Sequence, residues 1–327
     1  MTAREIEKYK QELVDFWAAI KTANDAGYRY GVDVPGTRRE SHIPYIGDYH
    51  PMHVMNLYYP EDFRADNGKL PAIIDIHGGG WMYGTVDDSE RYLQYLASKG
   101  YAVMGMNYRL LPETDLGGII RDIFASLSWL AEYGGARGFD LSRILLTGDS
   151  AGGHLALLTA YLMQSAALRE IYGVADPGLA LSAVCVCSTC TETDRLGGIA
   201  DDEESERGRG TAAAYRELLL GPDGEAAPWN GHMSISETAG EGPLPPVLII
   251  GSESDSLYAQ TKLLEEIFRR HGQTYEELIW KREDGPHLQH VVNISHWEWR
   301  ESILSNDRML AFFDAAAARD RSAASAG

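Results

Sequence analysis

Residues 145–158 read LLTGDSAGGHLALL, and this stretch decides the fold. One apolar run ends at Thr147, another begins after Gly153, and a serine stands between them with glycines two residues before and two residues after it. The chain must turn from a strand into a helix within a few residues, and the two glycines remove side chains that would collide there. Such a turn pushes the Ser150 hydroxyl out beside the N-terminus of the following helix, where a negative oxygen is stabilised. Ser150 is therefore a candidate nucleophile.

Outward from this turn, apolar runs alternate with segments of helical periodicity. The predicted strands cover residues 53–59, 72–76, 102–106, 144–147, 181–187, 247–250 and 275–280, and the predicted helices cover 88–98, 118–132, 152–165, 257–271 and 299–317. This alternation predicts an α/β fold in which a mostly parallel sheet carries helices on both faces.

Three segments depart from this alternation. The first helix has Thr2 and Glu5 in capping-box spacing and an apolar stripe that suits either a lid over a site or an ordinary helix docked on the core: Ile6, Tyr9, Leu13, Trp17 and Ile20. Residues 191–243 contain no clear strand, and the small, polar end of the chain has little apolar surface. We expect an N-terminal cap at 1–45, a main domain at 46–315 with a cap insertion at about 191–243, and a flexible tail at 316–327.

Composition limits the possible partners and the compartment. A chain of 327 residues with a formal net charge of −19 disfavours nucleic acid as a partner. The N-terminus does not resemble a signal peptide, and no apolar run is long enough to span a membrane. The three cysteines, Cys185, Cys187 and Cys190, are crowded into one segment, which fits reduced thiols in a cytoplasmic protein better than disulfides or a zinc site. The sequence leaves open whether the chain forms a homodimer.

A second motif follows the strand at 72–76 and reads His77-Gly78-Gly79-Gly80-Trp81. Successive glycines make sense where the backbone approaches a ligand closely and points N–H groups at it. We expect the N–H groups of Gly79 and Gly80, with that of Ala151, to form an oxyanion hole. His77 is interpreted as a structural residue that holds the loop by hydrogen bonds. Trp81 either lines a substrate pocket or packs under the loop.

Together, HGGGW at 77–81, NYRL at 107–110 and GDSAGG at 148–153 resemble the hormone-sensitive-lipase branch of the α/β-hydrolase esterases, near acetylesterases and kynurenine formamidases. The resemblance covers roughly residues 50–315. It implies the eight-stranded α/β-hydrolase sheet, a Ser-His-Asp triad, and no metal or organic cofactor; the helical cap is expected from two of the departing segments, 1–45 and 191–243. One departure is DLGG at 115–118, which replaces the family's aromatic-proline stretch and leaves the geometry of that loop open.

The fold requires the triad in the order serine, acid, histidine. The segment after the strand at 247–250 is similar to the family's acid loop and selects Asp255, with Glu253 as the alternative. His287 follows Gly285-Pro286 after the last strand, where the chain turns back over the sheet, and is the predicted base. His290 and His296 lie further along and are expected to pack or to face solvent.

These residues predict a serine carboxylesterase that hydrolyses small to medium acyl esters through an acyl-enzyme. An amidase or formamidase, a lactonase or a carbohydrate acetylesterase would use the same residues. A non-catalytic binding protein on this fold would be expected to have lost a triad member, and none is missing here. The expected partner is therefore a small ester, with neither nucleic acid nor membrane involved.

Overall fold

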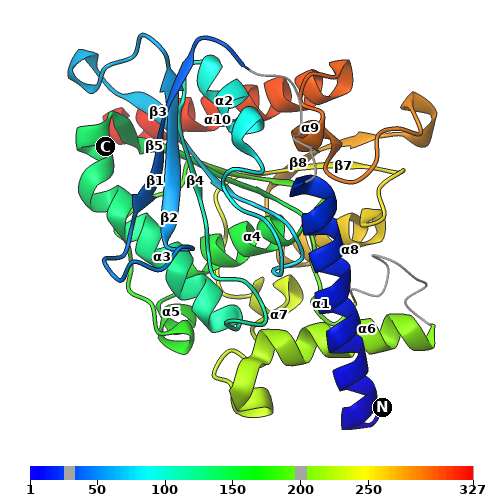
Figure 1. Ribbon diagram of the computed structural model, residues 1–327. Coiled ribbons are helices and arrows are strands. Elements are labelled where there is room, and N and C mark those ends of the chain that lie inside the picture. The colour runs from blue at the N-terminus through cyan, green and yellow to red at the C-terminus, as the bar shows by residue number, and fades with distance from the viewer. Residues whose placement is uncertain (26–33, 196–204, 327) are drawn as a thin grey trace.

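A computed structural model describes residues 1–25, 34–195 and 205–326. Its centre is one eight-stranded sheet with the strand order β1-β2-β4-β3-β5-β6-β7-β8 (Figure 1). β1 pairs antiparallel with β2 and β2 with β4, whereas the remaining neighbours pair in parallel. The strands are β1 (Thr37–Pro44), β2 (Val54–Pro60), β3 (Leu70–Ile76), β4 (Ala102–Met106), β5 (Phe139–Asp149), β6 (Ala183–Cys187), β7 (Val247–Ser252) and β8 (Tyr275–Trp280).

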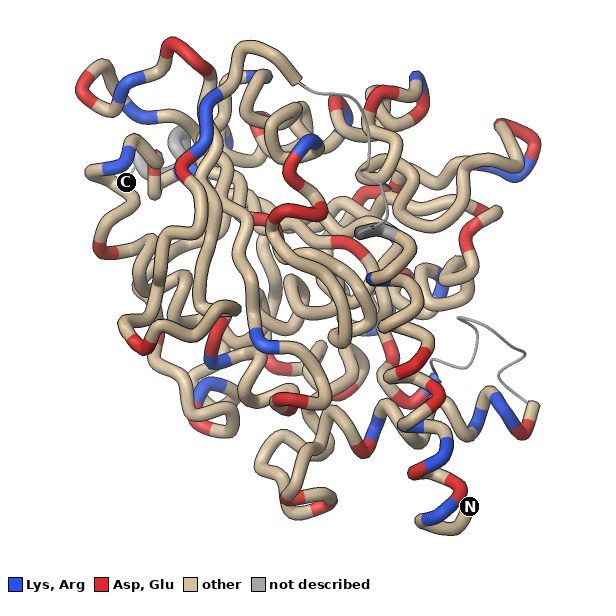
Figure 2. The backbone as a smooth tube through the Cα atoms, in the orientation of Figure 1, with Lys and Arg blue, Asp and Glu red and all other residues tan. Residues whose placement is uncertain are grey.

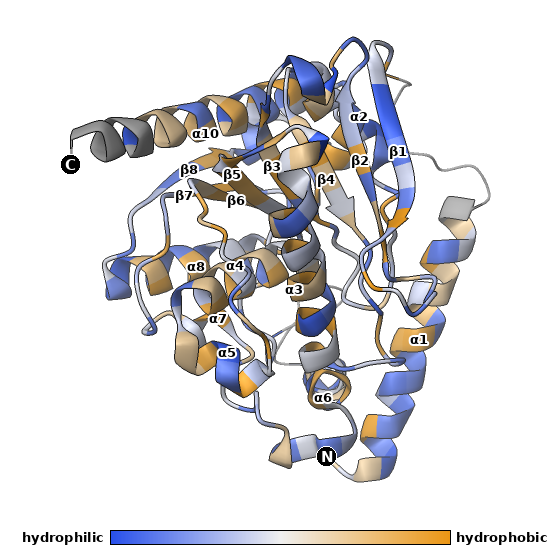
Figure 3. Ribbon diagram, turned by 90° about the vertical axis from the view of Figure 1, so that its left-hand side faces the viewer, coloured by the Kyte–Doolittle hydropathy of each residue, from blue (hydrophilic) through white to orange (hydrophobic). Residues whose placement is uncertain are grey.

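Helices cover both faces of this sheet, as the sequence predicts. Side chains alternate between the faces of a strand, so Ile74 and Ile76 of β3 pack on one side while Ile73 packs on the other. The first side is covered by α3 (Leu116–Tyr133), α4 (Ala151–Gln164) and α8 (Tyr258–His271), and the second by α2 (Glu90–Ser98) and α10 (Arg300–Ala326). The central strands are accordingly the hydrophobic part of the molecule (Figure 3).

All seven predicted strands are present, but the sequence analysis missed β1. This strand, TRRESHIP, is polar and lies at the edge of the sheet with most of its residues at least partly exposed, so it lacks the apolar signal of the buried strands. The boundary expected at residue 45 is therefore wrong, because the sheet begins at Thr37.

The two regions expected to form a cap contain α1 (Ala3–Asp25) and α6 (Glu206–Leu220), which cross and contact each other (Figure 1). The predicted capping box is present, because the Glu5 carboxylate accepts from the Thr2 N–H and the Glu5 N–H donates to the Thr2 hydroxyl. A Cβ on Gly210 of α6 would lie 2.2 Å from the Tyr9 ring of α1, so this glycine allows the two helices to approach. Of the predicted insertion 191–243, residues 196–204 lie outside the described part of the chain.

Shorter helices complete the chain: α5 (Ala166–Tyr172), α7 (Ile235–Thr238) and α9 (Val292–Ser295). The flexible tail was expected to start at residue 316, but that residue lies within α10. Ala316 and Ala317 are buried against the core. All three cysteines are buried and free. No helix in the described residues is long and apolar enough to cross a membrane. Lys and Arg are scattered among Asp and Glu along the chain (Figure 2).

Candidate active site

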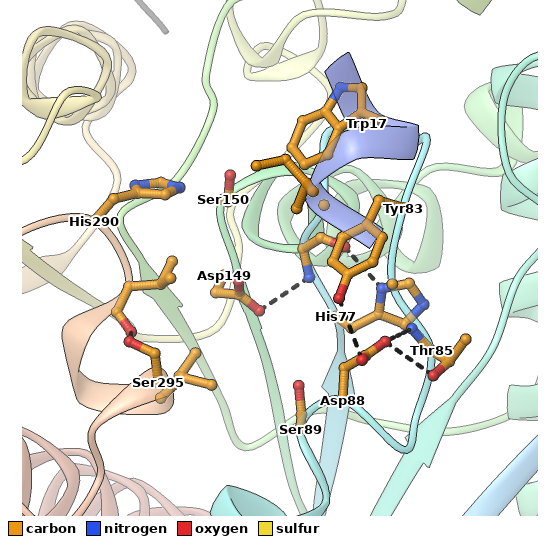
Figure 4. A pocket seen from close by; sticks show the side chains of 16 residues that line it. Trp17, His77, Tyr83, Thr85, Asp88, Ser89, Asp149, Ser150, His290 and Ser295 are labelled. Carbon is orange, nitrogen blue, oxygen red and sulfur yellow. Dashed lines mark hydrogen bonds between the residues drawn. The ribbon is translucent and has the colours of Figure 1, made fainter. Parts of the chain in front are cut away.

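The turn between β5 and α4 has the strained geometry that its sequence predicts. Ser150 takes φ +52° and ψ −120°, a backbone conformation that a residue with a side chain rarely adopts. A Cβ on Gly152 would lie 2.0 Å from the Ile76 carbonyl oxygen, which shows why glycine is needed there. The turn is held by the Ser150 N–H, which donates to the Cys187 carbonyl at 2.9 Å, and by the Cys190 N–H, which donates to the Ser150 carbonyl at 3.0 Å. The hydroxyl thus stands at the carboxyl end of the sheet (Figure 4).

Asp255 lies in the loop between β7 and α8, and it is paired with His290. Its Oδ1 accepts from the Leu257 N–H at 2.8 Å and lies 2.9 Å from Nδ1 of His290. The Asp255 side chain is almost fully buried, whereas about a third of the His290 side chain is exposed. His290 and Ser150 line the same pocket from opposite loops (Figure 4). Glu253, the alternative acid, instead pairs with the exposed Lys281.

His287 does not meet Asp255, so its predicted place beside the acid is wrong. Its Nε2 lies 3.9 Å from the carboxylate of Glu301, its ring packs edge-on against Trp299, and nearly half of the side chain is exposed. The loop folds back at Gly285, where a Cβ would lie 2.4 Å from the His287 ring. His287 therefore points away from the sheet, and the next turn of the loop brings His290 inward. His296 stacks on Trp299 with a ring separation of 4.1 Å, in line with its expected packing role.

Opposing effects set the charge of this pair. Burial alone would lower the pKa of His290, but the hydrogen bond to Asp255, the charge of that carboxylate and the charge of Asp149 raise it above its ordinary value. Burial alone would raise the pKa of Asp255, but the hydrogen bond from His290 and its positive charge lower it. The site therefore stabilises an imidazolium beside an ionised carboxylate.

The glycine loop takes backbone conformations that explain its composition. Gly79 and Gly80 have φ values of +106° and +58°. His77 has the structural role expected of it, because its Nδ1 lies 2.8 Å from the Gly78 carbonyl and its ring stacks on Tyr108 at 4.4 Å. Burial lowers the pKa of His77, which keeps the ring neutral. The hydroxyl of Tyr108, from the NYRL motif, donates to the His77 carbonyl at 2.8 Å.

Of the three residues expected to form an oxyanion hole, Gly79 lines the same pocket as Ser150, and Ala151 directly follows that serine. Within the described residues, the hydrogen bonds provide no acceptor for the backbone N–H groups of Gly79, Gly80 and Ala151. Ala151 is the first residue of α4, where helix geometry leaves N–H groups without a partner. Such groups are available to a developing negative oxygen.

A pocket of about 160 Å³ opens beside Ser150. Its walls come from α1, from the segment after the glycine loop and from the segment around α9; they include Trp17, Ile20, Tyr83, Thr85, Asp88, Val291 and Ile294 (Figure 4). Trp81 is not among them. It is fully buried between His154 and Tyr215, so it packs under the loop, which was the second of its two expected roles.

Trp17 reaches the pocket together with Tyr83, whereas the pocket residue proposed from the sequence was Trp81. Its indole stacks on Tyr83 at 6.0 Å, and its Nε1 donates to the Tyr215 hydroxyl of α6 at 2.8 Å. A Cβ on Gly80 would lie 2.3 Å from the Trp17 ring, so the helix packs directly on the glycine loop. The signal that could have found Trp17 is the apolar stripe of α1, whose last members face the site.

Within the described residues, no group of three or more His, Cys, Asp or Glu side chains is placed to hold a metal ion. The groups gathered at the pocket are a serine, an imidazole, a carboxylate and backbone N–H donors, a set used in acyl transfer.

Known proteins share this arrangement of elements. Esterase B from Lactobacillus rhamnosis is 40% identical, with a TM-score of 0.91 over 99% of each chain. The same enzyme inhibited by a C4-C4 tributyrin phosphonate gives a TM-score of 0.89 over 98% of each chain, also at 40% identity. Carboxylesterase NlhH of Mycobacterium tuberculosis is 38% identical over 109 residues, 33% of either protein.

Lipase 2 of a Moraxella species is 40% identical over 90 residues, 27% of this chain and 21% of that protein. The chain thus matches between about a fifth and a third of the length of these curated relatives. A family described by its alpha/beta hydrolase fold matches residues 73–287, which include the glycine loop, the serine turn and the acid loop. With that match over most of the sheet that carries Ser150, the chain belongs to the alpha/beta hydrolase fold family.

Proposed function

We propose that this protein is a serine carboxylesterase in which Ser150, His290 and Asp255 form the catalytic triad. The observation that carries the proposal is the hydrogen bond between Asp255 and His290 at the mouth of the pocket that contains the strained Ser150. The relatives support ester hydrolysis in particular, since they include esterases and a carboxylesterase.

The reaction follows from the roles of these groups. The Ser150 hydroxyl oxygen attacks the ester carbonyl carbon while its proton passes to Nε2 of His290, and the resulting oxyanion accepts from the N–H groups of Gly79, Gly80 and Ala151. His290 then gives the proton to the leaving alkoxide, the C–O bond breaks, and an alcohol departs. A water molecule repeats the sequence on the acyl-enzyme and releases the carboxylic acid. Asp255 keeps the proton of the neutral imidazole on Nδ1 and stabilises the imidazolium.

The pocket favours a short acyl group. Its volume of about 160 Å³ is close to that of a cavity of about 150 Å³ that accommodates benzene, so a chain of roughly four to six carbons fills it. The tributyrin phosphonate that inhibits Esterase B is of the same size class. We therefore propose butyrate and hexanoate esters as better substrates than esters of long acyl chains.

Replacement of Ser150 tests the proposal. The variant Ser150→Ala is expected to lose about 10⁶-fold in kcat on p-nitrophenyl butyrate, because the nucleophile is removed. A fluorophosphonate probe should modify the wild type at Ser150 and leave the variant unmodified, as measured by intact-protein and peptide mass spectrometry. Ser142→Ala, at the exposed start of the same strand, serves as the matched control and should retain wild-type activity.

Substantial turnover by Ser150→Ala, with contaminating esterase excluded, would refute the role of this serine. A panel that adds N-formylkynurenine, an acylated lactone and an acetylated sugar to the p-nitrophenyl esters then ranks the hydrolases that use the same triad. Higher kcat/KM on the amide, lactone or sugar substrate than on every simple ester would replace the carboxylesterase assignment.

A further inference from the structure

We propose that Asp149 is a positioning residue of this site, whose ionised carboxylate holds the oxyanion loop through Gly78 and acts with Asp255 to stabilise the charged imidazole of His290. The inference deepens the proposed function and rests on it. It concerns a residue that the Ser-His-Asp reaction does not itself use, although Asp149 lies directly before the nucleophile and lines the pocket with it.

The first part of the inference rests on a direct contact. Oδ1 of Asp149 accepts from the Gly78 N–H at 3.0 Å (Figure 4). A Cβ on Gly78 would lie 2.4 Å from Oδ2 of Asp149, so only glycine permits the loop to approach the carboxylate this closely. The bond joins the residue before Ser150 to the residue before Gly79. It therefore fixes the position of the loop donors relative to the nucleophile, and such preorganisation is the main source of oxyanion stabilisation.

The second part rests on the charges around the Asp149 carboxylate, which is 8% exposed. Five titratable groups interact electrostatically with Asp149, each from a different segment: Asp75 on β3, Tyr92 on α2, Tyr108 after β4, Cys190 after β6 and His290 before α9. Burial, together with the charge of Asp149, raises the pKa of Asp75 well above its usual range, and burial likewise raises the pKa values of both tyrosines and the cysteine. Burial therefore favours the neutral form of each of these four groups. His290, which lines the same pocket as Asp149, is the group among the five that carries a positive charge when it is protonated.

The ionisation of Asp149 falls within the working range of such an enzyme. Burial raises the pKa of Asp149 to about 6, against the charge of His290 and the Gly78 N–H, which lower it. Above that pH the carboxylate is charged and raises the pKa of His290. As the pH falls through this value, protonation removes the field at the imidazole and weakens the bond to Gly78. Because the two groups interact, the two protonations belong to the pair rather than to either residue alone.

Asn and Ala variants at position 149 separate the two effects. Asp149→Asn removes the charge but keeps an oxygen that accepts from Gly78. The fall of kcat/KM on the acidic side of its pH profile (the acid limb) should move to lower pH by roughly one unit, since protonated His290 loses a stabilising anion. The kcat at the pH optimum should fall about tenfold. Asp149→Ala also loses the acceptor, so kcat should fall roughly a further tenfold, with KM little changed, because the loop donors act on the transition state.

Asp62→Asn removes the same charge from an exposed turn after β2 and is the matched control, with an unchanged pH profile. The wild type supplies a measurement that needs no variant. Below pH 6 its log(kcat/KM) should fall more steeply than one decade per pH unit, because two protonations contribute, whereas Asp149→Asn should follow a slope of one.

The proposal is overturned if Asp149→Asn keeps the wild-type acid limb and a kcat within about twofold, or if the wild-type limb has a slope of one. If Asp149→Asn does not fold, as judged by circular dichroism, the proposal is tested by the wild type alone, through the slope of its log(kcat/KM) against pH below about pH 6. These outcomes are distinct from failure of the proposed function, which would appear as activity retained by Ser150→Ala.

Discussion

At the scale of single residues, His290 is the group on which the proposed mechanism turns. Because its Nδ1 bonds Asp255 and its side chain lines the pocket, His290→Ala should lose about as much kcat as Ser150→Ala, on the order of 10⁶-fold, and the double variant should be hardly slower. His287→Ala, three residues away on the outer side of the loop, is the matched control and should stay within about threefold of the wild type. Steady-state kinetics of the three variants on p-nitrophenyl butyrate checks this prediction. The reverse ranking, with His287→Ala inactive and His290→Ala active, would return the base to His287.

The same residues show which parts of the candidate site could be predicted from the sequence. Ser150 and Asp255 are found from local motifs, because a strand-to-helix turn and an acid loop each require particular neighbours within a few positions. Local motifs do not identify the catalytic base, because its position depends on how the loop after β8 folds, and three histidines follow that strand. A signal was nevertheless present. His290 follows the buried Leu288 and precedes the apolar residues of α9, which anchor it to the core, whereas His287 follows a charged and glycine-containing turn.

At the scale of elements, α1 forms a wall of the pocket. Trp17→Ala should open this wall, so that the ratio of kcat/KM for octanoate over butyrate esters rises about tenfold as longer chains gain apolar contact. Tyr215→Phe is the matched control, since it removes the hydrogen bond to Trp17 without widening the pocket and should leave that ratio unchanged. A p-nitrophenyl ester series from C2 to C10 measures the ratio. An unchanged chain-length profile in a folded Trp17→Ala variant would show that α1 does not set acyl length.

The apolar stripe predicts α1 as a helix but cannot say what it covers. Different turns of this helix make different contacts, because Leu13 packs in the core and Trp17 lines the pocket. Its partner α6 could not be predicted from periodicity. The sequence of α6, ERGRGTAAAYRELLL, contains two glycines and few apolar residues in its first half, and it is a helix that packs on another helix rather than on the sheet. The polar edge strand β1 was missed for a similar reason, since burial creates the pattern from which strands are recognised.

At the scale of the whole molecule, a buried ionic cluster joins α3 to the segment after β4. Oδ2 of Asp122 accepts from the backbone and Nε of Arg109, both at 2.9 Å, and Oδ1 accepts from Nη2 at 2.7 Å. Asp122 is 1% exposed, and Nε2 of His53 lies 3.2 Å from it. Removal of this carboxylate leaves the partly buried donors of Arg109 without their acceptor. None of the three residues lines the pocket, so the cluster serves stability rather than substrate binding.

Asp122→Ala should therefore lower the free energy of unfolding by about 3 kcal/mol, as measured by urea denaturation, while the kcat/KM of the folded variant stays near the wild-type value. Asp307→Ala removes an exposed partner of Lys99 and should cost at most about 0.5 kcal/mol. Equal midpoints for the two variants would show that the buried cluster contributes no more than a surface pair.

The two outer strands of the sheet bear on self-association. An unpaired strand edge is a template on which a second copy can add its own strand and start an aggregate. Here β8 presents the exposed side chains of Glu276 and Glu277, and β1 carries Arg38, Arg39 and Glu40 before its pairing register shifts. A second copy would have to bring the same charges against themselves in a β8-to-β8 contact, and it would meet an irregular edge at β1. Growth of the sheet from one molecule into the next is thereby opposed at both edges.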